Sequence, residues 1–287
     1  MKTILKLALS VLVAFEVVSL AARTTPQDKA GKTGSGLYYE TTGAGAPIIF
    51  IHGFSLDRRM WDSQAREFAK AHQVIRYDLR GHGKSAAYDR PFTAHEDLLS
   101  IYEAFEIESA VLVGLSAGAE IAVDFALEYP ARVRQLVLAS PGLGGYVPRG
   151  SFEWMAPVMA ALREGKAREA TQKWVETPLM KIANDPQADA QMQEIVLSNW
   201  AIWTYDRKLQ KRLDPPAIGR LAEISMPALI LVGELDLVDT HSIANLLVEQ
   251  VRDAKRIEIP GVGHLLNLAA PDAFNAELRR FINTSGQ

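Results

Sequence analysis

A serine between two glycines is the first group in this chain that could do chemistry. Residues 114–118 read Gly-Leu-Ser-Ala-Gly, follow the apolar run 110–113 directly and lead into a helical pattern that starts at Ala117. In that setting Gly-x-Ser-x-Gly forms a tight strand-to-helix turn, which exposes the serine oxygen above the edge of a sheet. The helix dipole behind the turn favours developing negative charge. Ser116 is therefore the predicted nucleophile.

A serine hydroxyl needs a base, and the base needs a partner that fixes its tautomer. His264 lies in a glycine-rich turn after the expected strand 256–259, and Asp236 follows the expected strand 228–233. Both positions are carboxyl ends of strands, the edge at which open α/β sheets bind their ligands. The order serine, aspartate, histidine is also the one that this architecture uses. We predict that these residues and Ser116 form a catalytic triad.

Ordinary loop roles are the alternative for the two partners. An isolated histidine after a strand is usually a hydrogen-bonded loop residue, and Asp236 could be a turn former. Glu234 and Asp239 lie near Asp236 and compete for the role of the acid. The coincidence of order and location favours the triad.

Acyl transfer also needs donors for the charge that develops on the attacked carbonyl oxygen. The backbone N–H of Ala117, directly after the nucleophile, is one predicted donor. The N–H of Phe54, in the loop after the run 48–51, is the other. His52, in the same loop, is interpreted as shaping the loop rather than as a second base, because a residue directly after a buried strand is more often structural.

Short apolar runs alternate with amphipathic stretches, which predicts a mostly parallel sheet covered by helices. Helices are expected over 93–106, where Thr93 and Glu96 form a capping box, and over 117–129, ended by Pro130. An additional antiparallel strand over 37–42 is expected at the sheet edge. The near-continuous apolar runs that predict buried strands are 47–51, 74–78, 110–114, 134–139, 228–233 and 256–259.

Residues 142–224 break this alternation with helical patterning, and they predict a helical cap between two halves of the core, 37–141 and 225–287. Large side chains are concentrated in the cap, and as a group they are expected to wall an apolar pocket. The alternative is that each packs only into the interior of the cap. The predicted wall residues are Trp154, Met155, Met159, Trp200, Trp203 and, from the core, Leu265.

The N-terminus resembles a secretory signal peptide. Lys2 and Lys6 precede the apolar run 7–15, and small residues at 19–22 offer a cleavage site. We expect a signal peptide over 1–21, a flexible lead-in over 22–36 and export to the periplasm or the medium. An N-terminal membrane anchor is the alternative, but Glu16 leaves the apolar run well short of the ~20 residues that a span requires, so no stable membrane anchor is expected.

Composition excludes several classes of function. The 287 residues include 31 Lys and Arg against 34 Asp and Glu, a net charge of −3, which lacks the basic excess that nucleic-acid binding needs. Cysteine is absent, so disulfides, thiolate nucleophiles and Cys-ligated metals are excluded. Residues 81–85 end like a phosphate-binding loop, but Asp78 stands where its first glycine is required. No cofactor, metal or nucleic acid is expected, and the oligomeric state stays open.

With these motifs the chain resembles the α/β-hydrolase superfamily over nearly all of residues 37–284. Besides 114–118, the segments 52–54 (His-Gly-Phe), 77–85 (Tyr-Asp-Leu-Arg-Gly-His-Gly-Lys-Ser) and 263–264 (Gly-His) stand in the places and order of that family. The resemblance implies an α/β fold with a mostly parallel eight-stranded sheet, helices on both faces and a helical cap. Epoxide hydrolases and haloalkane dehalogenases are disfavoured, because their nucleophile is an aspartate where this chain has Ser116.

The predicted function is a serine hydrolase that cleaves small to medium, largely apolar carboxylic esters through an acyl-enzyme. A lactonase or a carbon-carbon bond hydrolase would use the same triad, so these activities remain alternatives. A non-catalytic sensor of a small ligand on the same fold is a further alternative. A small-molecule ester or lactone is the expected partner in each enzymatic case.

Overall fold

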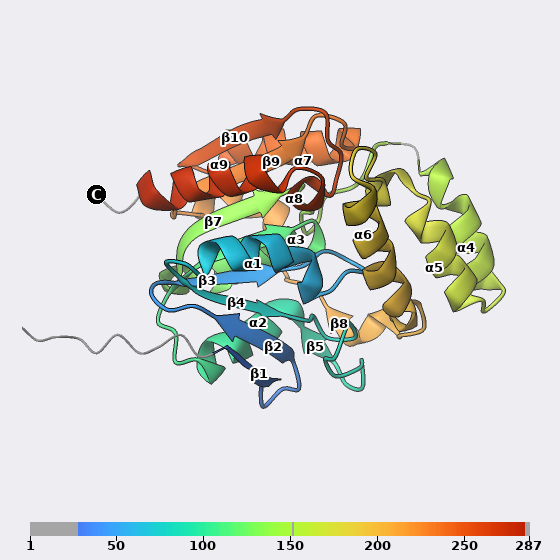
Figure 1. Ribbon diagram of the computed structural model, residues 1–287, viewed down its shortest axis with the longest axis horizontal. Helices are drawn as coiled ribbons and strands as arrows, with labels where there is room; N and C mark the ends of the chain where they lie inside the picture. Colours follow the sequence, from blue (N-terminus) through green and yellow to red (C-terminus); the bar gives the residue numbers. More distant parts are fainter. Residues whose placement is uncertain (1–27, 151, 285–287) are drawn as a thin grey trace, which may run out of the picture.

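The central sheet carries the strands that position the predicted site. The structure is a computed structural model that describes residues 28–150 and 152–284, and within these residues eight strands form one sheet (Figure 1). Their order across the sheet is β1-β2-β4-β3-β6-β7-β9-β10. The strands are β1 (Lys29–Lys32), β2 (Tyr38–Thr42), β3 (Pro47–Ile51), β4 (Gln73–Tyr77), β6 (Ala110–Leu115), β7 (Val133–Ala139), β9 (Ala228–Gly233) and β10 (Ala254–Ile259).

All six predicted apolar runs are strands, with ends within two residues of those predicted. From β4 to β10 every neighbouring pair is parallel. The central strands β6 and β9 are buried at every position. Their continuous apolar sequences follow from this burial, because helices cover both faces of a parallel sheet and leave no face for polar side chains.

The N-terminal edge of the sheet differs from the prediction. The antiparallel strand expected at the edge, β2, is second in the sheet, because β1 pairs with it on the outside. Residues 29–32, predicted to be part of a flexible lead-in, form this edge strand. Three of its four residues, Lys29, Ala30 and Lys32, are exposed, so backbone pairing holds it and no hydrophobic pattern reveals it.

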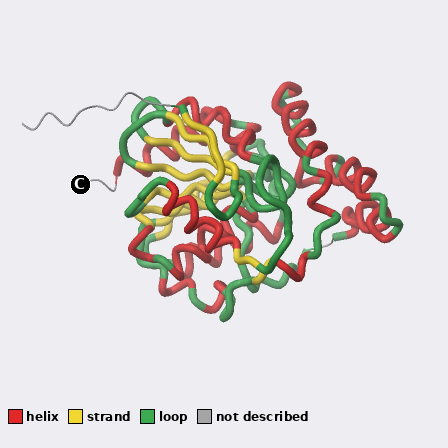
Figure 2. The backbone as a smooth tube through the Cα atoms, turned by 90° about the horizontal axis from the view of Figure 1, so that it is seen from below, coloured by secondary structure: helices red, strands yellow, loops and turns green. Residues whose placement is uncertain are grey.

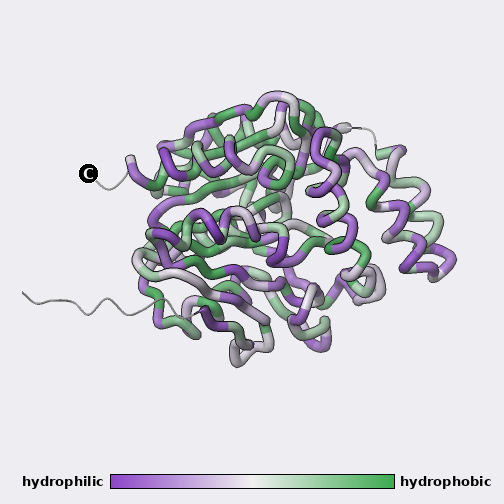
Figure 3. The backbone as a smooth tube through the Cα atoms, in the orientation of Figure 1, coloured by the Kyte–Doolittle hydropathy of each residue, from purple (hydrophilic) through white to green (hydrophobic). Residues whose placement is uncertain are grey.

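Helices cover both faces of the sheet, which Figure 2 shows from below. The helices α2 (Ala94–Ala104), α3 (Ala117–Glu128) and α7 (Val238–Gln250) pack their buried side chains into one hydrophobic core. On the other face α1 (Asp62–Phe68), α8 (Leu266–Ala269) and α9 (Pro271–Thr284) share a second core with the cap. Hydrophobic stretches run through the central strands between these layers (Figure 3).

The predicted start of α2 is confirmed. The Thr93 hydroxyl accepts a hydrogen bond from the Glu96 N–H at 3.4 Å and donates one to the Glu96 carboxylate at 2.8 Å. The N-cap thus satisfies a backbone donor that the helix cannot pair internally. Pro130 follows α3 closely, as predicted from the clash of a proline ring with a helix interior.

The segment between β7 and β9 is mainly helical and stands to one side of the sheet (Figure 1). It contains α4 (Ala156–Arg163), α5 (Ala167–Val175), α6 (Pro186–Ser198) and several one-turn 3-10 helices. It also contains β8 (Gln210–Lys211), which pairs with β5 (Phe92–Thr93) of the core. Two residues are too short for a β pattern, so the sequence did not predict this link between cap and core.

The predicted signal peptide, residues 1–21, and the first part of the predicted lead-in lie outside the described residues. Over 28–150 and 152–284, none of the helices combines the length and the apolar character needed to cross a membrane.

Candidate active site

Ser116 occupies a sharp turn between β6 and α3. Its φ of +56° and ψ of −114° lie in a region that residues with a side chain rarely adopt. A Cβ on Gly114 would stand 2.3 Å from the Gly118 carbonyl oxygen, and one on Gly118 would stand 2.2 Å from the Ile51 carbonyl oxygen. Glycine is therefore required at both flanking positions, because neighbouring backbone carbonyl groups leave no room for a Cβ atom. Such strain persists only where the surroundings enforce it, which is typical of functional sites.

The three residues of the predicted triad follow strands that end at one edge of the sheet. Ser116 follows β6, Asp236 follows β9 and His264 follows β10, and these strands run parallel in the order β6-β7-β9-β10. Backbone hydrogen bonds tie the loops together at this edge. They run from Ser116 N–H to Ala139 O (3.0 Å), from Ser140 N–H to Leu231 O (2.7 Å) and from Leu235 N–H to Val262 O (2.9 Å).

His264 and Asp236 are in direct contact. The His264 Nδ1 atom lies 2.9 Å from Oδ1 and 3.1 Å from Oδ2 of Asp236, and both side chains are buried. The Leu237 N–H donates to Asp236 Oδ1 at 2.7 Å. Burial opposes ionisation of Asp236, but the attraction of His264 and these hydrogen bonds outweigh it and lower the pKa of the carboxyl. Asp236 is thus held as a carboxylate against the imidazole.

The two competing acids have other partners. Glu234 accepts a hydrogen bond from the Gly261 N–H at 2.8 Å. Asp239 accepts from the Tyr146 hydroxyl at 3.0 Å and from the N–H groups of Arg149 and Gly150. Both therefore brace loops around the site, and Asp236 is the acid that the fold brings to the histidine.

His52 has the structural role predicted for it. Its side chain is fully buried, with Nδ1 2.8 Å from the Gly53 carbonyl oxygen, and Nε2 accepts from the Leu79 N–H at 2.8 Å. Burial lowers the pKa of the imidazole, so it remains neutral with both nitrogens engaged. The neighbouring His82 is also buried. Its burial and, to a smaller extent, the nearby His52 lower its pKa to about 3. Neither histidine competes with His264 as a general base at neutral pH.

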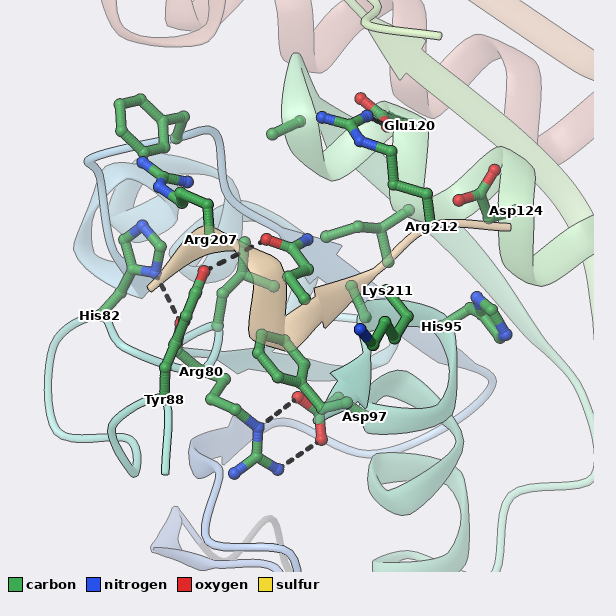
Figure 4. A pocket seen from close by; sticks show the side chains of 17 residues that line it. Arg80, His82, Tyr88, His95, Asp97, Glu120, Asp124, Arg207, Lys211 and Arg212 are labelled. Atoms are coloured by element: carbon green, nitrogen blue, oxygen red, sulfur yellow. Dashed lines mark hydrogen bonds and ion pairs between the residues drawn. The ribbon is translucent and has the colours of Figure 1, made fainter. Parts of the chain in front are cut away.

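Two backbone amides have no hydrogen-bond acceptor within the part of the chain that the structure describes. Among the described residues, neither the Phe54 N–H nor the Ala117 N–H forms a hydrogen bond. Phe54 follows the loop that His52 braces, and Ala117 begins α3. Both residues line a cavity of about 200 Å³ (Figure 4). The residues predicted to supply the oxyanion donors thus adjoin one cavity.

That cavity lies at the junction of core and cap, and most of the residues that line it are polar or charged. Tyr88 from the β4–β5 connection packs on Tyr205 of the cap with ring centroids 4.9 Å apart, next to the β5–β8 pair. The charged side chains that line the cavity are Arg80, Asp97, Glu120, Asp124, Arg207, Lys211 and Arg212 (Figure 4). The cap residues among them were not predicted from the sequence. The only sequence signal was the pair of basic dipeptides at 207–208 and 211–212.

The six side chains predicted to wall an apolar pocket do not line this cavity. Trp203 packs on Phe54 with ring centroids 5.0 Å apart, and both rings also contact Trp174. Trp154 extends this aromatic group at 6.2 Å from Trp174. Met155 is partly buried, Met159 is exposed and Leu265 is buried, while Trp200 carries the Arg168 guanidinium on its ring at 4.0 Å.

Asp124 is the carboxyl group that this environment perturbs most. It lies one helical turn after Glu120 on α3, and its Oδ1 atom is buried without a hydrogen bond among the described residues. Burial, reinforced by the negative charge of Glu120, raises the pKa of Asp124 to about 7. The cavity wall therefore carries a carboxyl that is partly protonated at neutral pH. In the part of the chain that the structure describes, no group of three or more His, Asp or Glu side chains could hold a metal ion.

Comparison with known proteins adds family membership to this geometry. The family model described as "Alpha/beta hydrolase family" matches residues 48–277. The chain is 26% identical over 257 residues to a pimeloyl-acyl-carrier-protein methyl ester esterase of Nitrosospira multiformis, covering 85% of this chain and 97% of the relative. It is 25% identical over 232 residues to 3-oxoadipate enol-lactonase 1 of Acinetobacter baylyi, covering 79% and 85%.

A solved structure shares the fold. A thermophilic esterase from Thermogutta terrifontis superposes with a TM-score of 0.74 at 24% identity, covering 91% of this chain and 100% of that one. The family model spans most of the chain and includes the turn that carries Ser116 and the loops that carry Asp236 and His264. The chain is therefore a member of the alpha/beta hydrolase family.

Proposed function

We propose that this enzyme is a serine hydrolase that cleaves carboxylic esters of small to medium size through an acyl-enzyme. The hydrogen bond between His264 Nδ1 and Asp236 carries the proposal. Because Asp236 occupies Nδ1, Nε2 is the nitrogen left to exchange a proton with Ser116. The similarity to proteins named as an esterase and an enol-lactonase supports hydrolysis of an ester bond.

In the proposed reaction the Ser116 oxygen attacks the ester carbonyl while His264 Nε2 takes its proton. Asp236 stabilises the imidazolium, and the N–H groups of Phe54 and Ala117 bind the oxyanion. The tetrahedral intermediate expels the alcohol, which His264 protonates. His264 then activates a water molecule that attacks the acyl-enzyme, and the acid is released with Ser116 restored. The Phe54 side chain, which lines the cavity and is backed by Trp174 and Trp203, would contact an apolar part of the ester.

Hydrolysis of p-nitrophenyl esters from acetate to decanoate tests this proposal. We expect an optimum of chain length for the wild type and a loss of several orders of magnitude in kcat for Ser116→Ala. Ser242→Ala, on the exposed side of α7, is the matched control and should behave as the wild type. Turnover that survives Ser116→Ala would refute the nucleophile. A thermal shift with a small ligand but no turnover would favour the sensing role instead.

Lactone opening is the second candidate, and the similarity to an enol-lactonase favours it. The same residues would attack a lactone carbonyl, but the alkoxide would stay attached to the acyl group. Rates with a lactone and with the open-chain ester of the same acid separate the two activities. A kcat/KM that is higher for the lactone would assign the enzyme to lactone hydrolysis.

A further inference from the structure

One arginine at the cavity beside the proposed oxyanion site has no counterion over residues 28–150 and 152–284. Arg207 comes from the cap, and its guanidinium carbon lies 4.7 Å from the ring centroid of Phe54. Within the described residues it forms no ion pair and no hydrogen bond. The other two arginines of the lining are paired. Arg80 binds Asp97 at 2.6 Å, and Arg212 binds Glu120 at 2.8 Å.

The surroundings leave the charge of Arg207 uncompensated. Arg207 is exposed, and desolvation of the part that faces the cavity lowers the pKa of its guanidinium. Tyr88 acts to raise this pKa, but no carboxylate among the described residues does so. The group stays protonated in any case, because an arginine does not lose its proton in proteins. The guanidinium stands over the Phe54 ring, and among the described residues its N–H groups have no acceptor, so they are available to a ligand.

The acidic residues of the cavity do not supply a counterion. Glu120 is engaged by Arg212, and Asp124, with its pKa near 7, carries only part of a negative charge at neutral pH. Lys211 adds a second cation without an ion pair among the described residues. Figure 4 shows Arg207 and Arg212 extending toward different walls, Arg207 to the side of His82 and Arg212 to the side of Glu120. The unpaired charge of the cavity is therefore positive.

We propose that this cavity binds a carboxylate carried by the substrate, with Arg207 as the residue that selects an acidic ester or lactone over a neutral one. The inference rests on the proposed function, because Phe54 and Ala117 line the same cavity and their amides are assigned to the oxyanion. Ser116 and His264 are not among the residues that line it, so the cavity would hold the part of the substrate beyond the carbonyl. Arg207 contacts Phe54 in this cavity. A carboxylate is the planar anion that a guanidinium fork binds best, through parallel charge-assisted hydrogen bonds.

Two matched pairs of esters test the inference on each side of the ester bond. Methyl hydrogen adipate is compared with methyl hexanoate, and 4-acetoxybutyrate with butyl acetate. Within each pair a terminal carboxylate replaces a methyl group. The measured quantity is the ratio of kcat/KM for the acidic ester to that for the neutral ester, determined for the wild type, Arg207→Gln, Arg207→Lys and Arg163→Gln. Arg163 is an exposed arginine of the cap at the end of α4 and is the control.

We expect the wild type to prefer the acidic member of at least one pair, and Arg207→Gln to lower that ratio about tenfold, the effect of one charge-assisted hydrogen bond. Arg207→Lys should recover part of the ratio, since it keeps the charge but not the fork. Arg163→Gln should keep the wild-type ratio. Equal ratios for the wild type and Arg207→Gln in both pairs would overturn the inference and leave ester hydrolysis standing.

Binding measured without catalysis separates failure of this inference from failure of the proposed function. Calorimetry measures the dissociation constants of adipate and of 4-hydroxybutyrate. Each is titrated into Ser116→Ala and into the double variant that combines Ser116→Ala with Arg207→Gln. Weaker binding to the double variant would support the anion site even if no ester is turned over. Equal binding to both proteins, or no binding to Ser116→Ala, would overturn it.

Discussion

His264 Nδ1 lies within hydrogen-bond distance of both carboxylate oxygens of Asp236, at 2.9 and 3.1 Å. Asp236→Asn removes the charge but keeps the shape, and an amide would allow the tautomer that directs the proton away from Ser116. We expect kcat to fall about 10³- to 10⁴-fold, with Glu234→Gln as the control that remains close to wild type. Steady-state kinetics on the best ester measure this, and a kcat reduced by less than about tenfold would remove Asp236 from the proposed role.

A methyl group on the second glycine of the nucleophile elbow, the turn formed by residues 114–118, should disrupt that turn. In Gly118→Ala the new Cβ would lie 2.2 Å from the Ile51 carbonyl oxygen and 2.7 Å from that of His52, so β3 and α3 would have to separate. We expect a loss of about 2–4 kcal/mol in the free energy of unfolding, together with loss of activity. Gly219→Ala, with no atom within 4 Å of its added Cβ, is the control for urea unfolding. Equal stability of the two variants would show that the close approach is relieved elsewhere.

The contact between Trp174 and Ser55 ties the cap to the core. The indole N–H donates to the Ser55 hydroxyl at 2.7 Å, and the ring packs on Phe54. Trp174→Phe keeps an aromatic ring but leaves the hydroxyl without this donor, which should cost about 1–3 kcal/mol in unfolding free energy. It should also lower kcat by loosening the loop that carries the Phe54 N–H.

Trp200→Phe is the comparison for this change, since Trp200 carries only an exposed arginine on its ring. Its expected cost is below about 1 kcal/mol. Chemical denaturation of both variants gives the difference. If Trp174→Phe and Trp200→Phe lower the unfolding free energy equally, the hydrogen bond from Trp174 to Ser55 does not anchor the cap.

Asp124 predicts a stability that depends on pH. Its pKa is about 7 in the folded protein against an ordinary 3.8, so the folded state holds a proton that the unfolded state releases between these values. The resulting stabilisation is complete below about pH 4 and is lost as the pH rises through 7. Asp124→Asn should therefore be more stable than the wild type at pH 8, by up to about 4 kcal/mol, and equal to it near pH 4.

Urea unfolding at several pH values measures this difference, with the exposed Asp253→Asn as the control. The control should differ from the wild type by a similar amount at every pH. An advantage of Asp124→Asn that does not change between pH 4 and pH 8 would mean that the carboxyl titrates normally.

The sequence predicted those elements that depend on interactions between residues close together in the chain. The elbow depends on residues 114–118 alone, because a buried strand, two glycines and a helix start follow one another directly. The capping box from Thr93 to Glu96 spans four residues, and each central strand is identified by its own apolar run. The edge strand β1 and the short β8 were missed, since their pairing partners and not their side chains make them strands.

The sequence favoured Asp236 over Glu234 and Asp239 only by order and location, and it contained no distance between any of these acids and the histidine. All three lie near the carboxyl end of β9, and the packing of that loop against the one after β10 decides which carboxylate meets His264. The residues that line the cavity could likewise not be predicted from the sequence. The lining joins the cap residues 207–212 to a core loop more than one hundred residues earlier in the chain. The sequence by itself determined the central strands of the sheet, the turn at Ser116 and the candidates for its partners, because short-range patterns encode these. Only the tertiary structure decided which acid pairs with the histidine and which arginine has no counterion among the described residues, because distances between segments far apart in the chain determine both.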